Sequence, residues 1–354
     1  MTHQAELRQP TICIHYPLSD MPWGGANQFL RALRDRIAAR GLLTSDLEQA
    51  DIVLLNGNPG TIKNNLRLIR ELRKISDHSV VVIRMDGPVT HRDHALIQNN
   101  WLYMLCNYYA DGIIFQSKWS RENNYRLGMS RPPLETLVTN APDPKLFHPE
   151  ARRKAHDKVR CIATSWSSNM MKGFGDYLFL DENLDFSTFE FTFVGNSPYH
   201  FKNIKIVPPM TSKALGALLR KQDIFVTASV NDACSNSVIE ALHSGLPVVY
   251  VQSGGHAELV KRNGLPYTNK RELLFAIQEV SENYEKYSQN FTQPNIDEVT
   301  KQYIEFMQKV FASCATNPKR PGVTGTSSML WQLFLIYAAH NTDIFCRKKL
   351  WRAR

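Results

Sequence analysis

Short, continuous apolar runs alternate along this chain with longer stretches in which apolar residues recur every three or four positions. The runs "DIVLLN", "SVVVIRMDG" and "DGIIFQS" are of the first kind, and "QFLRALRDRIAARGL" is of the second. Continuous apolar runs are typical of parallel strands that helices cover on both faces. The helical spacing between the runs supplies those helices. The pattern therefore predicts an α/β fold built on parallel sheets.

A break in this alternation divides the chain in two. Residues 141–158, "APDPKLFHPEARRKAHDK", contain three prolines, a run of charge and little periodicity, which is typical of a linker. A second α/β series follows, and 354 residues exceed the size of one ordinary core. We therefore predict two Rossmann-like, doubly wound domains that face each other across a cleft. Their boundaries are residues 1–150 and 151–312, with a basic, partly apolar tail over 313–354.

The net charge of +9 is concentrated in that tail. Residues 319–354 hold seven Lys or Arg and one acid, Asp343, so +6 lies in the tail and only +3 in the rest. A nucleic-acid-binding protein usually carries its charge on a folded face or groove, so no nucleic-acid partner is expected. Residues 329–339 are apolar but too few to span a bilayer. Either they form an interfacial helix on anionic lipid, aided by the basic residues, or they pack on the protein body.

Targeting and redox signals favour the cytoplasm. The N-terminus lacks a basic head followed by an apolar stretch of signal-peptide length. The six cysteines are scattered without a C-x-x-C pair, which favours reduced thiols over disulfides or a zinc site. We therefore expect a cytoplasmic protein, which is peripheral at the inner face of the membrane if the tail binds lipid.

One predicted loop and helix, in "DACSNSVIEALHSGLP", have the features of an anion site. We expect the helix to begin near Asn236, and Ser235, Asn236 or Ser237 can cap it. Gly245 ends the helix. The first turn of such a helix offers unpaired backbone N–H groups and a partial positive charge, as phosphate binding requires.

Two acidic residues flank this predicted anion site. Asp232 lies in the loop before the helix, and Glu240, eight positions later, lies in what we expect to be the first turn. Two carboxylates beside an anion site suit a ligand with hydroxyls next to a phosphate, which describes a nucleotide sugar. The alternative for Glu240 is a capping box with Ser237, in which the carboxylate accepts the backbone N–H of the cap. The alternative for Asp232 is an ordinary loop aspartate.

Three further positions are candidates for the same site, and two histidines are weighed as metal ligands. Gly24 and Gly25 suit either a tight turn or a backbone that approaches a phosphate. Lys172 follows a predicted strand directly before a glycine, so it is either a phosphate-binding point charge or a solvated lysine. His91 and His94 are spaced i, i+3 without a clear further ligand, which is weak evidence for a metal.

The region 229–260 resembles the E-x7-E signature of retaining glycosyltransferases of family 4, which have the GT-B fold. Asp232 and Glu240 occupy the two acidic positions, with Asp in place of the first Glu, and "GLPVVYVQSGGHAEL" follows as in the family. The segment "WSSNMMKGFGDYLFL" resembles the phosphate-lysine segment and places Lys172 at the diphosphate. The arginine that often precedes that lysine is replaced by a stretch that reads SWSSN. "FTFVGNSP", which includes Asn196, matches the strand end near the base pocket.

The resemblance extends to the first domain and covers the chain to about residue 312. "GGANQFLRAL" resembles the glycine loop that approaches the phosphates or the donor sugar, which implies that role for Gly24 and Gly25. Asp86 stands where many members carry a histidine near the reacting carbon, so it either takes over part of that role or orients the acceptor. A cap of the turn before Pro88 and an ion pair with Arg84 are the alternatives. "IIFQSKWSRE" and "VTNAPDPKLFHPE" match further family segments.

The resemblance implies a hexosyltransferase-like enzyme that moves a sugar from a nucleoside-diphosphate donor to an acceptor hydroxyl, with retention at the anomeric carbon. Glu240 would hold the donor ribose and Asp232 the hydroxyls of the transferred sugar. Lys172, Gly25 and the N–H groups of residues 235–237 would stabilise the departing diphosphate. No metal or other cofactor is expected, because the chain lacks the D-x-D pair of the other main glycosyltransferase fold. The acceptor would be a glycan, a lipid-linked compound or another hydroxyl compound, in cell-surface polysaccharide or glycoconjugate biosynthesis.

Two other functions are compatible with this fold. A sugar-nucleotide epimerase is the first, but the acid-x7-acid loop does not support that reaction. The second is a catalytically silent sugar-nucleotide-binding protein or membrane scaffold, in which Asp232 marks decay of the site. Intact Lys172 and Glu240 argue against decay.

Overall fold

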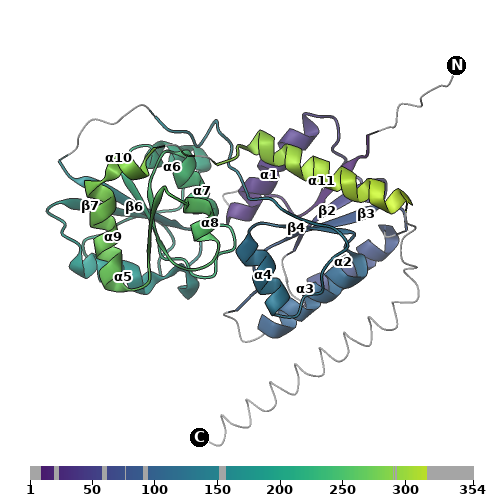
Figure 1. The fold of residues 1–354 in the computed structure, drawn as a ribbon, viewed down its shortest axis with the longest axis horizontal. Helices are drawn as coiled ribbons and strands as arrows, with labels where there is room; N and C mark the ends of the chain where they lie inside the picture. Colours follow the sequence, from purple (N-terminus) through teal and green to yellow (C-terminus); the bar gives the residue numbers. More distant parts are fainter. Residues whose placement is uncertain are drawn as a thin grey trace, which may run out of the picture.

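The computed structural model describes residues 9–19, 24–57, 62–75, 77–90, 95–150, 157–289, 291 and 293–316. They form two α/β domains side by side, each a parallel sheet with helices on both faces (Figure 1). The predicted pair of doubly wound, Rossmann-like domains is confirmed. Within these ranges, no helix has both the length and the apolar character that crossing a membrane requires. The tail helix predicted over 329–339 lies outside the described residues, as do His91 and His94.

The first sheet changes direction at its first strand. Its order is β1-β2-β3-β4-β5, and an isolated parallel bridge between Ile12 and Leu43 extends it beyond β1. The chain therefore leaves β1 in one direction and continues through β2 in the other. Because parallel crossovers are right-handed, α1 lies on one face and α2, α3 and α4 lie on the other. The elements are β1 (Ile12–His15), α1 (Gly24–Ala38), β2 (Ile52–Gly57), α2 (Ile62–Ile75), β3 (Val80–Met85), α3 (Ala95–Tyr109), β4 (Gly112–Phe115), α4 (Lys118–Arg126) and β5 (Glu135–Leu137).

The second sheet has six parallel strands in the order β11-β10-β9-β6-β7-β8. It changes direction between β6 and β9, and the carboxyl ends of these two strands border the crevice where such sheets bind ligands. Helices α5 and α9 cover one face, and α6, α7 and α8 cover the other. The elements are β6 (Val159–Ser165), the 3₁₀ helix η1 (Met170–Lys172), α5 (Phe174–Asn183), β7 (Phe189–Gly195), β8 (Lys205–Val207), α6 (Ser212–Leu219), β9 (Ile224–Thr227), α7 (Asn236–His243), β10 (Val248–Val251), α8 (His256–Val260), β11 (Gly264–Tyr267), α9 (Lys270–Glu282) and α10 (Tyr284–Tyr287).

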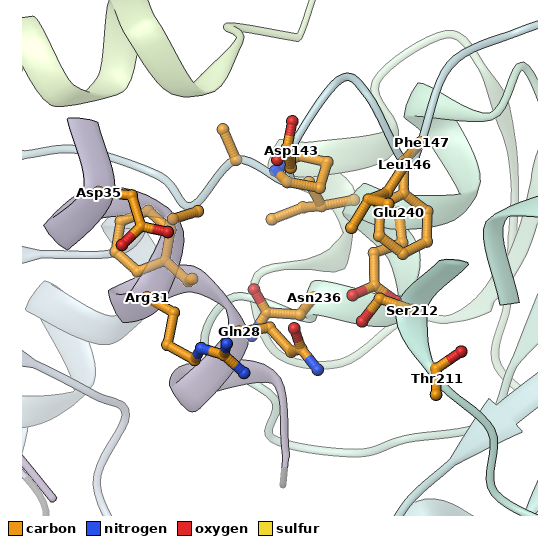
Figure 2. Close-up of a pocket in the computed structure, with 15 residues that line it drawn as sticks. Gln28, Arg31, Asp35, Asp143, Leu146, Phe147, Thr211, Ser212, Asn236 and Glu240 are labelled. Carbon is orange, nitrogen blue, oxygen red and sulfur yellow. The ribbon is translucent and has the colours of Figure 1, made fainter. Parts of the chain in front are cut away.

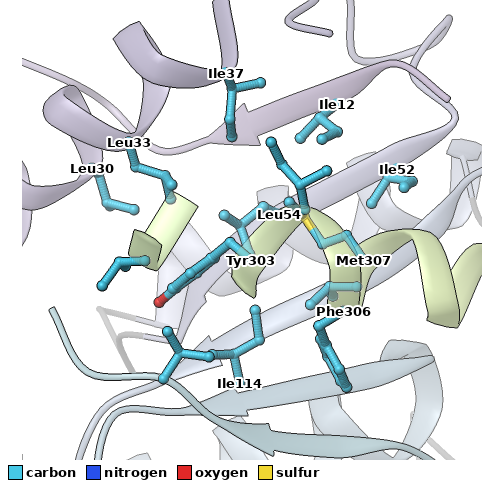
Figure 3. Packing of buried hydrophobic residues seen from close by; sticks show 14 of the residues in the cluster. Ile12, Leu30, Leu33, Ile37, Ile52, Leu54, Ile114, Tyr303, Phe306 and Met307 are labelled. Carbon is cyan, nitrogen blue, oxygen red and sulfur yellow. The ribbon is translucent and has the colours of Figure 1, made fainter. Parts of the chain in front are cut away.

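The last described helix, α11 (Ile296–Thr316), crosses back and packs on the first sheet beside α1 (Figure 1). Tyr303 and Met307 are fully buried there in the core cluster that α11 shares with the first sheet (Figure 3). The sequence-based boundaries grouped residues 296–312 with the second domain, whereas their apolar side chains belong to the core of the first. Among the described elements, helices of the second domain cover both faces of the second sheet, whereas α1 is the one helix of the first domain on this face of the first sheet. That face therefore has room for the apolar stripe of α11.

Candidate functional site

A cavity of about 210 Å³ opens between the two domains, at the carboxyl ends of β6 and β9. It lies at the point where the second sheet changes direction, which is the general ligand position of such sheets. From the first domain, α1 contributes Gly25 and Gln28. From the second come the end of β6, Lys172, the start of α6, the loop after β9 and the start of α7, namely residues 164–167, 172, 212, 215, 232, 234–237 and 240.

The start of α7 supplies the anion-binding features of this cavity. Ser235 is the N-cap, and the helix runs from Asn236 to a C-cap at Ser244, followed by Gly245 with a φ of 81°. The Ser235 side chain accepts no hydrogen bond from the backbone N–H groups of the helix, and its hydroxyl pairs instead with the Ser237 hydroxyl at 3.0 Å. The first backbone N–H groups are therefore not taken by the cap side chain, and the helix dipole favours an anion in front of them.

Glu240 lies farther along this helix than expected. Because α7 begins at Asn236, Glu240 is its fifth residue and follows the first turn instead of lying in it. Since the N-cap is Ser235, Ser237 and Glu240 do not hold the cap and N3 positions, and the capping-box interpretation is wrong. Burial raises the pKa of Glu240 to about 8. A carboxyl group kept neutral beside a cavity can both donate to and accept from a ligand hydroxyl.

A second cavity of about 290 Å³ continues from the first along α7 (Figure 2). Gln28, Asn236 and Glu240 line both cavities. Figure 2 shows Arg31 and Asp35 of α1 on the opposite wall from Glu240. The two cavities therefore form one cleft between α1 and α7, and Glu240 stands where they join.

The structure brings Lys172 and Asp232 together. The Nζ atom of Lys172 lies 3.2 Å from Oδ2 of Asp232 and donates to the Ser229 hydroxyl at 3.2 Å, which in turn donates to Asp232 at 3.3 Å. Burial pushes the pKa of Asp232 upward. The charges of Lys172 and His256, with the hydrogen bonds from Lys172 and Ser229, outweigh burial and hold that pKa below its ordinary value. Asp232 is therefore ionised at neutral pH.

Lys172 reaches this position because of the glycine that follows it. Gly173 has a φ of 72°, in the left-handed region, and a Cβ atom there would lie 2.1 Å from the carbonyl oxygen of Ala228. The Val230 N–H donates to the carbonyl oxygen of Met171 at 2.8 Å, which fastens η1 to the loop after β9. Only glycine allows this close approach. The Lys-Gly pair in the sequence thus places the ammonium group over the end of β9.

The glycine turn Gly254-Gly255 packs against the backbone of Asp232. The Gly255 N–H donates to the Asp232 carbonyl oxygen at 2.9 Å, and a Cβ atom on Gly254 would lie 2.2 Å from that same oxygen. His256 follows the turn and is fully buried. Burial lowers the pKa of His256, and the nearby Asp232 charge offsets this only in part. These residues fix the backbone of the loop that carries Asp232.

The first helix of the first domain meets α7 end to end. A Cβ atom on Gly25 would lie 2.3 Å from Nδ2 of Asn236, so only glycine fits. Helix α1 begins at Gly24, and the N-termini of α1 and α7 therefore converge on one cavity. Each helix N-terminus carries about half a positive charge. Together with Lys172, these two ends make the cavity suited to an anion.

A buried arginine, not assigned to the site from the sequence, underlies this junction. The Arg84 side chain is 1% exposed, packs its guanidinium over the Phe29 ring, and donates to the side-chain oxygens of Gln116 and Asn140. Asn140 in turn donates to Asn236, the first residue of α7, at 3.0 Å. In the sequence, Gln116 directly follows the apolar run "IIF" and Asn140 lies two residues after "LETLV", which marks both as polar residues close to predicted strand ends.

Asp86 and Asn196, both predicted site residues, form hydrogen bonds with neighbouring residues. Asp86 pairs with Arg84 at 3.4 Å and accepts a hydrogen bond from Gln116, so the ion-pair alternative for Asp86 is realised. The Asn196 side chain donates to the carbonyl oxygen of Trp166 at 2.8 Å. Trp166 lines the cavity and Asn196 does not, so Asn196 adjoins the site through the loop that carries Trp166.

The described residues contain no group of three or more His, Cys, Asp or Glu side chains arranged to hold a metal ion. Metal independence stays a prediction. The convergent N–H groups and the lysine are the features here that can bind a phosphate without a metal.

Comparison with known proteins agrees with this geometry. Residues 180–283 match the family model of the group 1 glycosyl transferases, a segment that includes Asp232 and Glu240 but not Lys172. A comparison with curated protein sequences found no match.

Solved structures share the fold. HepE (Alr3699) of Anabaena, in complex with UDP and glucose, superposes with a TM-score of 0.64 at 15% identity, covering 87% of this chain and 100% of HepE. Its complex with UDP-glucose gives a TM-score of 0.62 at 13% identity, over the same shares of both chains. Sucrose-phosphate synthase of Thermosynechococcus elongatus gives 0.61 at 15% identity, covering 93% of this chain and 100% of that one. The chain thus has the GT-B fold of these proteins, and its residues 180–283 are similar to the group 1 glycosyl transferases.

Proposed function

We propose that this chain is a retaining glycosyltransferase that moves a sugar from a nucleoside-diphosphate sugar to an acceptor hydroxyl, without a metal. The observation that carries the proposal is the Lys172–Asp232 ion pair, which faces the cavity where the N-termini of α1 and α7 converge. An anion site next to an ionised carboxylate suits a ligand that has both a diphosphate and sugar hydroxyls. The family match over 180–283 and the fold shared with HepE, solved with UDP-glucose, support the same reading.

The reaction would divide between these groups as follows. The N–H groups at the start of α7 and the Lys172 ammonium hold the diphosphate, and Lys172 exchanges Asp232 for phosphate oxygens when the donor binds. Asp232, released from Lys172, accepts a hydrogen bond from a hydroxyl of the transferred sugar. Glu240 binds the ribose hydroxyls. The bond between the anomeric carbon and the phosphate oxygen breaks, and its electron pair goes to the diphosphate, where the converging donors stabilise the new charge.

The acceptor hydroxyl then bonds to the same face of the anomeric carbon, and its proton goes to the departing phosphate. Asp86, which pairs with Arg84 at 3.4 Å, would orient the acceptor. We propose that the acceptor is a glycan, a lipid-linked compound or another hydroxyl compound of cell-surface polysaccharide or glycoconjugate synthesis. The tail over 313–354 would place the enzyme at an anionic membrane surface inside the cell.

Thermal stabilisation by nucleotide sugars tests this proposal. The purified chain is heated with UDP-, GDP-, ADP- and TDP-sugars, alongside Glu240→Ala and Lys172→Ala. A ligand at 100 times its Kd that binds only the folded state stabilises it by about 2.7 kcal/mol. For a domain of 150 to 250 residues this raises Tm by roughly 5 to 10 °C.

One nucleotide family should stabilise the wild type, and both variants should lose the effect. Glu272→Ala is the matched control, because Glu272 accepts the Thr268 N–H on the surface of the second domain, away from the cavity. If none of the four classes of nucleotide sugar stabilises the wild type at millimolar concentration, the proposal is contradicted. Binding without turnover would instead favour the silent sugar-nucleotide-binding protein. The anomeric configuration of the product, read by NMR, decides retention.

A further inference from the structure

Glu258, in the second domain, is bonded to the backbone of the first. Its Oε2 accepts a hydrogen bond from the Lys118 N–H, and its Oε1 accepts one from the Trp119 N–H, both at 2.8 Å. Lys118 and Trp119 are the first two residues of α4, whose own cap, Ser117, accepts from the Ser120 N–H. The carboxylate of Glu258 therefore satisfies two N–H groups that the helix itself cannot pair.

The same contact adjoins the loop that carries Asp232. Gly255, three residues before Glu258, donates its N–H to the Asp232 carbonyl oxygen. A Cβ atom on Gly255 would lie 3.2 Å from the Ser117 side chain, and one on Gly87 would lie 3.0 Å from that of Ala233. The two domains thus touch through glycines directly around Asp232. The position of α4 relative to α8 and the position of Asp232 relative to the first domain are therefore set together.

We propose that Glu258 is a positioning residue that couples the closing of the two domains to the placement of Asp232 opposite the acceptor side. The inference rests on the proposed function. Apart from Gly25, the groups proposed to hold the donor (Lys172, Glu240 and the start of α7) lie in the second domain. Within the described part of the chain, the Glu258 carboxylate bonds α4 and none of these groups. When the domains part, the donor keeps those contacts, whereas Glu258 and α4 exchange their two hydrogen bonds for water. Glu258 therefore acts on turnover more than on nucleotide affinity.

The size of the effect follows from what a capping carboxylate contributes. Losing a side-chain cap typically lowers stability by an amount equal to about a 2- to 30-fold change in an equilibrium constant. Here the affected equilibrium is that between closed and open domains. Glu258→Gln keeps one oxygen acceptor but turns an NH₂ group towards the other N–H, so its effect should lie between those of wild type and Glu258→Ala.

The test compares the full chain with Glu258→Ala and Glu258→Gln, using UDP and UDP-glucose as probes. Glu272→Ala is the matched control, because Glu272 also accepts a backbone N–H, from Thr268 at 2.8 Å, but within the second domain. Three quantities are measured: the Kd for UDP, kcat and KM for UDP release from UDP-glucose, and hydrogen exchange of the Lys118 and Trp119 amides.

In Glu258→Ala we expect kcat to fall by about 2- to 30-fold, the two amides to lose protection, and the Kd for UDP to rise by a smaller factor than kcat falls, because among the proposed donor contacts the α1 end is the one that depends on closure. Glu272→Ala should change none of these. Unchanged kcat despite lost protection, or a Kd that rises as much as kcat falls, would overturn the inference. A wild type that neither binds UDP nor releases it from UDP-glucose refutes the proposed function with this donor. In that case hydrogen exchange still tests the contact between Glu258 and α4. Unchanged protection of the Lys118 and Trp119 amides in Glu258→Ala would show that the contact is absent and overturn the inference.

Discussion

Replacing Glu240 with glutamine should remove a pH dependence of stability that burial creates. The pKa of Glu240 rises from an ordinary 4.5 to about 8 on folding. Below pH 4.5 the carboxyl is protonated in both states, so its burial costs little. As pH rises from 4.5 to 8, the unfolded state releases the proton first, and the folded state loses stability relative to it. The shift corresponds to at most about 5 kcal/mol, since one pKa unit is worth about 1.4 kcal/mol.

Chemical denaturation of the wild type and Glu240→Gln at intervals from pH 4 to 9 measures this effect. The difference in free energy of unfolding should be small at pH 4, should grow in favour of Glu240→Gln up to about pH 8, and should then level off. Glu272→Gln is the control of opposite sign, because hydrogen bonds from Thr268 lower the pKa of Glu272 and its contribution is lost towards acidic pH. Parallel curves for wild type and Glu240→Gln across the whole range would refute the argument that the cleft buries this carboxyl.

Two further substitutions test the packing behind the site. Gly173→Ala should destabilise the fold by more than about 1 to 2 kcal/mol, which is the cost of a left-handed residue, because its Cβ also meets the Ala228 carbonyl oxygen at 2.1 Å. Gly175→Ala is the control: this position in α5 has open space around it, so the change should stabilise the fold by about 0.5 to 1 kcal/mol. Equal effects of the two variants on the free energy of unfolding in urea would contradict this explanation. Met307→Ala should lower the free energy of unfolding by about 2 to 5 kcal/mol, because the side chain is fully buried between α11 and the first sheet. Met170 is 58% exposed, so Met170→Ala should change that free energy by no more than about 0.5 kcal/mol. A similarly small effect at Met307 would mean that α11 is not part of that core.

The parts of this molecule that follow from local pattern could be predicted from the sequence. Continuous apolar runs predict parallel strands, and the ligand position of such sheets then brings the residues after β6 and β9 together. Lys172 and Asp232 are 60 positions apart in the chain, yet their places near strand ends together with the family resemblance assigned them to one site, and the structure joins them at 3.2 Å. The limits of α7 also followed, because cap and glycine signals are local.

The features that depend on how the two domains meet could not be predicted in the same way. Helix α11 has an apolar stripe that would suit either sheet, and only the free face of the first sheet decides between them. Arg84 reads as one charged residue in a strand, and its role depends on Asn140, 56 positions away. The Glu258 contact joins residues 140 positions apart across the cleft. The family resemblance placed Asn196 near the base pocket, and the hydrogen bond from its side chain to the Trp166 backbone depends on a loop that the local pattern does not specify.

The electrostatics of the cleft link donor binding to domain closure. The N-termini of α1 and α7 meet at Gly25 and Asn236, and both ends are positive, so the closed arrangement opposes two like partial charges. An anion near a helix N-terminus is typically worth about 0.3 to 1 kcal/mol, and up to about 2 kcal/mol when partly buried. A diphosphate between the two ends would turn their repulsion into attraction to a shared anion, with Lys172 beside it. If the donor binds as proposed, it therefore favours the closed state in which Glu258 bonds α4. Departure of the diphosphate removes that attraction and favours opening, so the same charges that bind the donor would also promote release of the product.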